Sequence, residues 1–568
     1  MLKSAKELFP ILKWGKTYNK SFLRLDVIAG ITVGAITIPE AIAYSSLAGL
    51  PPQAGLYAAF AALIVYFIFG TSNQLSVGPT SAISILVGST IGTITIINPS
   101  NFWAIASFVG LLVGIFSIVA WLLHMEFISR IISRSVLTGF SAGAAVYIMA
   151  TQLSKLMGID GAVTGGFFDR IAFIGTHLYE INIITLVIGI LAIVYLILSE
   201  KYLSKLPNAL IIVALPILLF SFTDLSWLGV SLVGNIPAGL PTFEIPKIPS
   251  VDLGLLVNLA AFCFILSYVE GMGTTKIMGL KRDDDSADSN KELLALGLAN
   301  ISSSIAQGFP VGGSFSRSAI NEESGSQSPF SSLFSAIIVI IVILFFTEFF
   351  SNLPQTILAA IIIVAVTKIF NLKELKRYYQ ISKKELIYAL VTAGGVLFLG
   401  ILQGVVVGVI ISVLGILYNI YNPHIVELGR VKGTKLYKDI KFHDPDESIS
   451  NILILRIDGA QVFLNSENID NEILKRIKYR KGISVLVLDM GNTDYLDMAG
   501  AENLELLNDT LAKKGIELRL AHLNSPVRKL LWKMGLNKKL NMYKGIYPTI
   551  DDIVNNWEKK EYDVEKEK

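Results

Sequence analysis

The sequence is poor in cysteine, histidine and charged residues. It has one cysteine in 568 residues, Cys263, which excludes an internal disulfide and any cysteine-based metal cluster. The five histidines form no cluster with metal-ligand spacing. Charged residues make up 16% of the chain and the formal net charge is +3, so the charge balance gives no indication of nucleic-acid binding. We therefore expect no metal, no cofactor and no nucleic-acid partner.

Apolar residues dominate instead. They form 52% of the chain, and the mean hydropathy is +0.59. A transmembrane helix needs about 20 predominantly apolar residues. Fourteen segments are candidates, although 292–307 and 314–325 are weak, and we predict a polytopic α-helical protein embedded in a lipid bilayer. The candidates are 27–47, 54–70, 77–97, 102–124, 136–153, 181–198, 207–222, 254–275, 292–307, 314–325, 330–350, 354–370, 385–401 and 403–421.

Basic residues predict the orientation of these segments. Residues 1–25 carry six lysines and arginines against one acidic residue, Glu7. Because lysine and arginine favour cytoplasmic connections, we place this end in the cytoplasm, and an even number of spans returns the chain to the same side. The connections then placed outside hold only Lys155, Arg170 and Lys247. We expect a multi-pass cell-membrane protein with both ends cytoplasmic.

The character of the sequence changes after Pro423. Apolar runs at 452–455 and 484–488 indicate buried strands, and helical stretches follow at 499–513 and 525–534. This alternation is typical of a soluble α/β domain. We divide the chain into an N-terminal cytoplasmic segment, a transmembrane domain, a linker, an α/β domain and a charged tail, at 1–25, 26–422, 423–435, 436–556 and 557–568.

A polar stretch, Gly312 to Ala319, stands between two apolar regions and contains Arg317. A charge at the bilayer centre costs at least about 2.5–3.5 kcal/mol and usually marks a site. The glycines, with Pro310 before them, interrupt regular helix, which is tolerated at membrane depth only where the backbone is buried or lines a cavity. A helix starting near Ser314 would direct its positive end there, which predicts an anion site. The alternative is a cytoplasmic loop with an interfacial arginine.

A second break of the same kind occurs at Gly78-Pro79, about 240 residues earlier. Proline fits the first turn of a helix, so a short extended piece followed by a helix start is expected here too. Two such breaks at equivalent positions are typical of inverted repeats that meet at a midplane site. A plain cytoplasmic turn is the alternative.

Two carboxyl groups lie inside apolar segments. Glu40 follows Pro39, and Tyr44 lies four residues on, so Glu40 and Tyr44 share a helix face. Glu270 occupies the first segment of the second half. A carboxyl group in the membrane is costly unless it is protonated, paired or wetted, and it can carry a proton with a substrate. For Glu270 the alternative is a structural carboxylate that caps a neighbouring helix.

Three stretches resemble the SulP family of sulfate permeases and anion exchangers. They are Pro39-Glu40-Ala41-Ile42-Ala43-Tyr44 continuing to Gly78-Pro79, Asn290-Lys291-Glu292-Leu293-Leu294-Ala295-Leu296-Gly297-Leu298-Ala299-Asn300, and Gly312-Gly313-Ser314-Phe315-Ser316-Arg317-Ser318-Ala319-Ile320-Asn321. The C-terminal region is similar to the sulfate-transporter and anti-sigma-antagonist (STAS) domain, through Leu488-Asp489-Met490, Asp497-Met498-Ala499-Gly500-Ala501 and Gly515-Ile516-Glu517-Leu518.

The resemblance implies fourteen segments arranged as a seven-plus-seven inverted repeat, with core and gate domains and a cytoplasmic STAS domain. It implies an anion held between the helix starts of segments three and ten, an acid for ion coupling in segment eight, and a homodimer. The implied substrate-binding residues are Glu40, Tyr44, Thr80, Ser316 and Arg317, and the implied coupling residue is Glu270.

Two positions depart from the family pattern. Many members have glutamine where this chain has Glu40, and a carboxylate repels an anion unless it is protonated, which favours proton coupling. In the STAS domain, Ala499 stands where anti-sigma antagonists carry a phosphorylated hydroxyl, so we predict no phosphorylation switch there.

The favoured hypothesis is a secondary active transporter of a small inorganic anion. Sulfate is the default substrate, with proton symport and alternating access. Bicarbonate, dicarboxylate or chloride transport or exchange are alternatives within the family, and an anion-sensing regulator acting through its STAS domain is an alternative of another class. A nucleobase permease is disfavoured because a neutral base has no need of Arg317. No nucleophile–base pairing or phosphate loop indicates an enzyme.

Overall fold

The computed structural model describes most of the chain. The described residues are 9–94, 102–127, 133–159, 161, 166–202, 208–223, 228–282, 287–441, 451–480, 482–540, 542 and 548–557. The expected charged tail lies outside them from residue 558 onward. The chain forms two compact units, Met1–Ser412 and Val413–Lys568, and each is described by itself.

Each of the fourteen predicted segments contains a helix. Those helices are α3 (Leu23–Leu47), α4 (Pro52–Phe69), α5 (Ser81–Ile94), α6 (Phe102–Leu122), α7 (Arg134–Met157), α9 (Ile183–Tyr202), α10 (Asn208–Phe222), α11 (Leu253–Arg282), α12 (Ser289–Ile305), α13 (Phe315–Glu323), α14 (Phe330–Phe345), α16 (Gln355–Ile369), α18 (Lys383–Leu399) and α19 (Ile401–Tyr421). Among the described residues, five further helices match no predicted segment of their own: α2 (Ile11–Thr17), α8 (Phe167–Thr176), α15 (Thr347–Ser351), α17 (Leu372–Ile381) and, in the second unit, α20 (Ser466–Tyr479).

Not every helix is long enough to cross a bilayer by itself. Seven helical stretches in the described residues have the length and apolarity of a membrane span, and four shorter helices are apolar. The shortest of the fourteen is α13, with nine residues. At a rise of 1.5 Å per residue, a helix of that length covers roughly 14 Å, about half of the hydrocarbon core. α13 is therefore a half-helix, as the polar stretch before it predicts.

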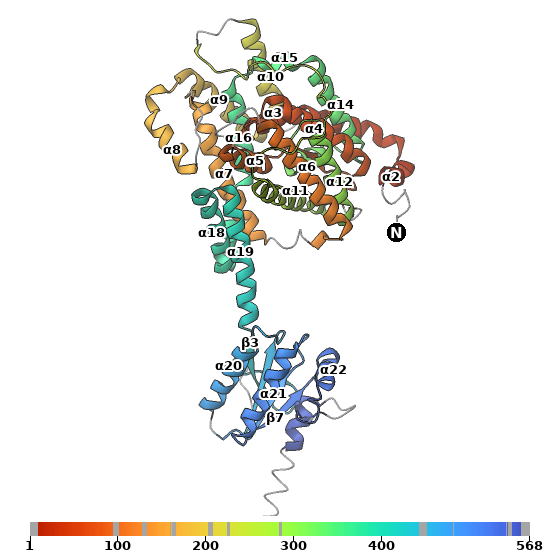
Figure 1. Ribbon diagram of the computed structural model, residues 1–568, viewed down its shortest axis with the longest axis vertical. Coiled ribbons are helices and arrows are strands. Elements are labelled where there is room, and N and C mark those ends of the chain that lie inside the picture. Colours follow the sequence, from red (N-terminus) through yellow and green to blue (C-terminus); the bar gives the residue numbers. More distant parts are fainter. Residues whose placement is uncertain are drawn as a thin grey trace, which may run out of the picture. The chain divides into compact units, whose positions relative to one another are not determined.

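The helices pack in two groups. In the first, α14 lies along α3, and α12 packs against α4 and α6. In the second, α7 contacts α16 and α18, and α9 contacts α10 and α16; Figure 1 shows α9 and α16 next to α7. The first group holds segments one to four and eight to eleven, and the second holds most of the remainder. This is the division into core and gate that the family resemblance implies.

Two short strands connect the halves of the first group. β1 (Ser76–Gly78) and β2 (Gly312–Ser314) pair antiparallel, with Ser76 opposite Ser314 and Gly78 opposite Gly312. Both strands are buried, and each leads directly into a half-helix, α5 or α13. The extended pieces predicted before the two helix starts are thereby confirmed.

The second unit is an α/β domain built on one sheet. Its strands are β3 (His424–Arg430), β4 (Tyr437–Asp439), β5 (Ile452–Asp458), β6 (Val485–Asp489) and β7 (Glu517–Ala521), in the order β4-β3-β5-β6-β7. Strands β5, β6 and β7 are parallel, and β3 is antiparallel to both β4 and β5.

Successive side chains along these strands point to opposite faces of the sheet. Leu453 and Leu486 face a core with α20 (Ser466–Tyr479), α21 (Met498–Ala512) and α22 (Ser525–Lys533), whereas Ile454 and Val487 face a second, smaller core. The runs predicted as buried strands are β5 and β6, and the predicted helices are α21 and α22.

Gly30→Ala should destabilise the protein, because α14 lies against this glycine. A methyl group there would stand 2.5 Å from Phe334 Cβ and 2.6 Å from Ser331 O. Overpacking of this kind costs about 1–3 kcal/mol. The matched control is Gly394→Ala on α18, where a methyl group meets no atom within 4 Å. We expect Gly30→Ala alone to lower the thermal unfolding temperature in detergent; equal melting of the two variants would contradict this packing.

Candidate functional site

The candidate site forms where the two half-helices begin. Ser314 is the N-cap of α13, and its Oγ accepts a hydrogen bond from Arg317 N at 3.4 Å. Thr80 precedes the first residue of α5, and its carbonyl accepts from Ser84 N at 3.0 Å. Because β1 pairs with β2, the two helix starts lie close together. Their free N–H groups and positive dipole ends thus converge on one region.

Arg317 lies at the centre of this region with no solvent exposure. Its Nη1 donates to Glu40 Oε2 at 2.9 Å in a buried ion pair. A methyl group at Gly78 would stand 3.1 Å from Arg317 Nη2, so the guanidinium packs against β1. The remaining nitrogens, Nε and Nη2, are buried and have no hydrogen-bond partner among the described residues. The arginine therefore has two unused donors in a place where an unmade hydrogen bond is expensive.

The other residues predicted for substrate binding differ in their burial and in their hydrogen-bond partners. Thr80 is buried and its Oγ1 has no partner in the described structure. Tyr44 is buried, and its phenol lies within electrostatic reach of Glu40 and Arg317. Ser316 is exposed, and its Oγ lies 3.2 Å from Ser314 Oγ. Thr80 and Tyr44 are therefore buried near Arg317, whereas Ser316 is exposed.

Glu270 approaches the region from α11. Tyr44 lies within electrostatic reach of this carboxylate as well. The next residue, Gly271, touches β2, because a methyl group on Gly313 would stand 2.7 Å from Gly271 Cα. Glu270 forms no ion pair or hydrogen bond within the described ranges. Among the described residues, no hydrogen bond therefore supports the alternative role of Glu270 as a cap of a neighbouring helix.

Several polar residues that join the two half-helices were not predicted from the sequence. Ser318 Oγ donates to Ser314 O at 2.6 Å and accepts from Ser76 N at 2.9 Å. Asn321 Nδ2 donates to Gln74 O at 3.0 Å. These bonds link α13 to the segment that enters β1. Positions 318 and 321, four and seven residues after the Ser314 cap, share its helix face, but this spacing does not identify their partners.

Two buried carboxylates hold the segments that flank the half-helices. Glu292, 1% exposed, accepts from Thr71 N at 2.8 Å, from Thr71 Oγ1 at 2.6 Å and from Tyr66 OH at 3.1 Å, ahead of β1. Asp26, which is fully buried, accepts from Gln327 N at 2.7 Å and from Ser328 Oγ at 2.7 Å, beyond α13. Both carboxylates bind backbone amides and so fix loops.

The arrangement is suited to a small anion. It offers helix N-termini, a guanidinium with unused donors and small hydroxyl groups, but no group that would attack or cleave a bond. In the part of the chain that the structure describes, no three histidine, cysteine, aspartate or glutamate side chains are placed to hold a metal ion.

Comparison with known proteins identifies the family. Residues 23–392 match the sulfate permease family, and residues 445–553 match the STAS domain. The chain belongs to the sulfate permease family. It is 33% identical over 548 residues to the chloroplastic sulfate transporter 4.1 of Arabidopsis thaliana, covering 93% of this chain and 79% of that protein. It is 30% identical over 527 residues to a probable sulfate transporter of Mycobacterium tuberculosis, covering 92% and 94%. These relatives are transporters and not enzymes.

Solved structures share the fold. The murine Slc26a9 anion transporter in its inward-facing state has a TM-score of 0.88 at 22% identity, over 98% of this chain and 95% of that one. The transmembrane domain of the cyanobacterial bicarbonate transporter BicA has a TM-score of 0.60 at 23% identity, over 70% and 98%. The chain is thus a multi-pass member of an anion-transporter family with a C-terminal STAS domain.

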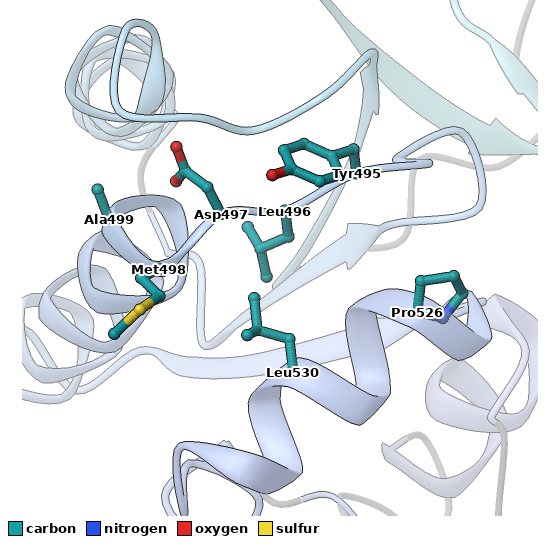
Figure 2. Close-up of a pocket in the computed structure, with 7 residues that line it drawn as sticks. All are labelled: Tyr495, Leu496, Asp497, Met498, Ala499, Pro526 and Leu530. Carbon is teal, nitrogen blue, oxygen red and sulfur yellow. The ribbon is translucent and has the colours of Figure 1, made fainter.

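The STAS domain carries a hollow at the start of α21. Figure 2 shows its lining, and Ala499 presents only a methyl group in the first turn of the helix. Asp497 is already engaged, since Oδ1 accepts from Gly500 N at 2.7 Å and Oδ2 from Phe463 N at 2.9 Å. The hollow has a volume of about 530 Å³ and is lined by Tyr495, Leu496, Asp497, Met498, Ala499, Pro526 and Leu530. The absence of a phosphorylation switch at Ala499 stays a prediction.

Glu292→Ala should destabilise the protein, because it removes the acceptor of three buried hydrogen bonds. Donors left unpaired cost about 1–3 kcal/mol each. Glu323→Ala at the exposed end of α13 is the control. We expect Glu292→Ala to lower the unfolding temperature by several degrees more than Glu323→Ala. Similar melting curves would show that Glu292 does not hold the Thr71 segment.

Proposed function

We propose that this protein is a secondary active transporter that binds a small inorganic anion, sulfate foremost, between the starts of α5 and α13. The observation that carries the proposal is the buried guanidinium of Arg317, whose Nε and Nη2 have no partner in the described structure. An oxyanion supplies several acceptor atoms in a fixed geometry, which suits the fork of an arginine. The direct contacts would come from Arg317, Thr80 and the amides at both helix starts, with Ser316 at the open side.

Sulfate is the first candidate because the relatives named above are sulfate transporters. The structural neighbours widen the range of candidate substrates, since BicA is a bicarbonate transporter and Slc26a9 is an anion transporter. Bicarbonate, a dicarboxylate and chloride are therefore the alternatives to test beside sulfate.

The ion pair with Glu40 supports proton coupling. The anion and the Glu40 carboxylate would both pair with the guanidinium of Arg317, and an ionised carboxylate repels an incoming anion. A proton on Glu40 weakens its ion pair and releases the guanidinium. Glu270, within electrostatic reach of Tyr44, would carry the coupled proton on the other side of the same region. Anion and proton would therefore bind together.

The way the halves are assembled supports alternating access. The hydrogen bonds from Ser318 and Asn321 tie α13 to the β1 segment, so both helix starts would move as one body with the bound anion. The second helix group, around α7 and α16, would form the surface along which that body moves. For the chain as a whole, we expect a homodimer in the cell membrane with both ends and the STAS domain in the cytoplasm.

Arg317→Ala should weaken sulfate binding at least tenfold, because it removes the guanidinium that pairs with the anion. Deleting one partner of a buried ion pair leaves the other uncompensated and costs about 3–5 kcal/mol. The double variant Glu40→Gln/Arg317→Gln avoids that cost and should lose binding as well. Lys276→Ala, at an exposed lysine of α11, is the control. Binding of labelled sulfate to purified protein measures the effect; normal binding by the double variant would refute the site.

Glu270→Gln should abolish the response of transport to a proton gradient, because an amide cannot carry the coupled proton. Uptake into proteoliposomes would be measured with and without an inward proton gradient, for sulfate and then for bicarbonate, chloride, oxalate and fumarate. We expect the gradient to accelerate uptake by the unmodified protein and not by the variant. Acceleration that persists in Glu270→Gln would exclude this residue as the coupling group.

A further inference from the structure

A second group of positive charges lies away from the candidate site, where α3 and α7 end. Lys155, in the last turn of α7, donates from Nζ to Ser46 Oγ at 2.5 Å, and Ser46 is in the last turn of α3. Arg170 of α8 lies within electrostatic reach of Lys155. Its guanidinium carbon is 5.9 Å from the ring centroid of Tyr147, a buried residue of α7. Two cations therefore lie near enough to repel each other.

These cations have no counter-ion in the described structure. No carboxylate among the described residues pairs with Lys155 or Arg170. The neighbouring Asp169 uses Oδ2 to accept from Gly166 N at 2.8 Å. Arg170 Nε is shielded from solvent and has no hydrogen-bond partner. Both side chains are partly exposed, so water solvates them in part, and an anion that joined them would stabilise the two like charges and satisfy the buried donor.

Helix dipoles do not account for both charges. A cation in the last turn of a helix is favoured by about 0.3–1 kcal/mol, which covers Lys155. Arg170 is the fourth residue of α8, Phe167–Thr176, and so lies near the positive end of that dipole. The dipole therefore opposes Arg170, and the cation–π contact with Tyr147 offsets only about 0.5–2 kcal/mol of its cost.

The group lies close to the candidate site along two helices. Ser46 follows Glu40 by six residues on α3, a rise of roughly 9 Å. The end of α3 rests on α5, since a methyl group at Gly88 would stand 2.4 Å from Leu47 O. Gly88 in turn follows Ser81, at the start of α5, by seven residues, or roughly 10 Å. Both helices that reach the candidate site therefore lead to this group.

We infer that Lys155 and Arg170, with the hydroxyl of Ser46, form a second binding site for a small oxyanion. The hydroxyl accepts from Lys155 and can donate to the anion, and Arg170 Nε supplies a further donor. An anion bound here would lie roughly 9 Å along α3 from Glu40. The class of ligand rests on the proposed function, whereas the existence of the site rests on the unpaired charges.

The test counts bound sulfate. Full-length protein in nanodiscs is titrated with radiolabelled sulfate, and we expect two sulfates per chain. Lys155→Cys and Arg317→Ala should each reduce the count to one. Treating Lys155→Cys with 2-aminoethyl methanethiosulfonate restores a positive charge and should restore the second sulfate, whereas the 2-sulfonatoethyl reagent should not. The native Cys263 is buried, so the unmodified protein serves as the reagent control.

Each result of this titration supports or overturns the second site. The second site would be overturned if Lys155→Cys left the sulfate count unchanged or if the two reagents had equal effects. It would also be overturned if neither reagent reacted, because a site open to sulfate must admit these reagents. A count that falls with Lys155→Cys but not with Arg317→Ala would keep the second site and reject the proposed transport site. Lys276→Cys, at an exposed lysine, should leave the count unchanged.

Discussion

The buried ion pair between Arg317 and Glu40 is the constraint on which the membrane unit depends. Isolated, either charge would be costly to bury, and their attraction offsets this only when the geometry is good. The pair joins residues 277 positions apart, so it brings α13 to α3 and gives the broken helices one fixed centre. It leaves the guanidinium half used. That incomplete satisfaction is the observation on which the proposed anion site rests.

The surrounding polar contacts keep this centre rigid. Glu292 and Asp26 fix the segments at either end, and Ser318 joins the two half-helices between them. All three bind backbone groups, which suits irregular backbone at membrane depth, where every N–H must find a partner inside the protein. Glycine makes the close approach possible, because a side chain at Gly313 would collide with α11. The motif that carries the family resemblance is thus largely a set of packing and hydrogen-bonding requirements.

Much of this architecture could be predicted from the sequence because it depends on local rules. Apolar runs located twelve of the fourteen helices, the segments at 292–307 and 314–325 were only weakly apolar, and the Gly78-Pro79 and Gly312-Gly313 breaks located the half-helices. The direct pairing of Glu40 with Arg317 could not be predicted, since it depends on how two distant helices approach. Amphipathic α8 and α17 were missed because hydropathy detects apolar runs. The contact between Ser316 and the anion stays a prediction, and only the fold reveals that this serine is exposed.

The side-chain charges at the proposed site determine how many protons each candidate anion would need. Arg317 contributes one positive charge, while Glu40 and Glu270 contribute one negative charge each, so the three side chains carry a net −1 when both carboxylates are ionised. A bound sulfate would raise this to −3, which two helix dipoles of roughly half a charge each cannot balance. Protonating both carboxylates returns the loaded site to −1, the charge of the empty one. On this count, a divalent anion at the proposed site would need two protons to restore the charge of the empty site, whereas chloride or bicarbonate would need only one.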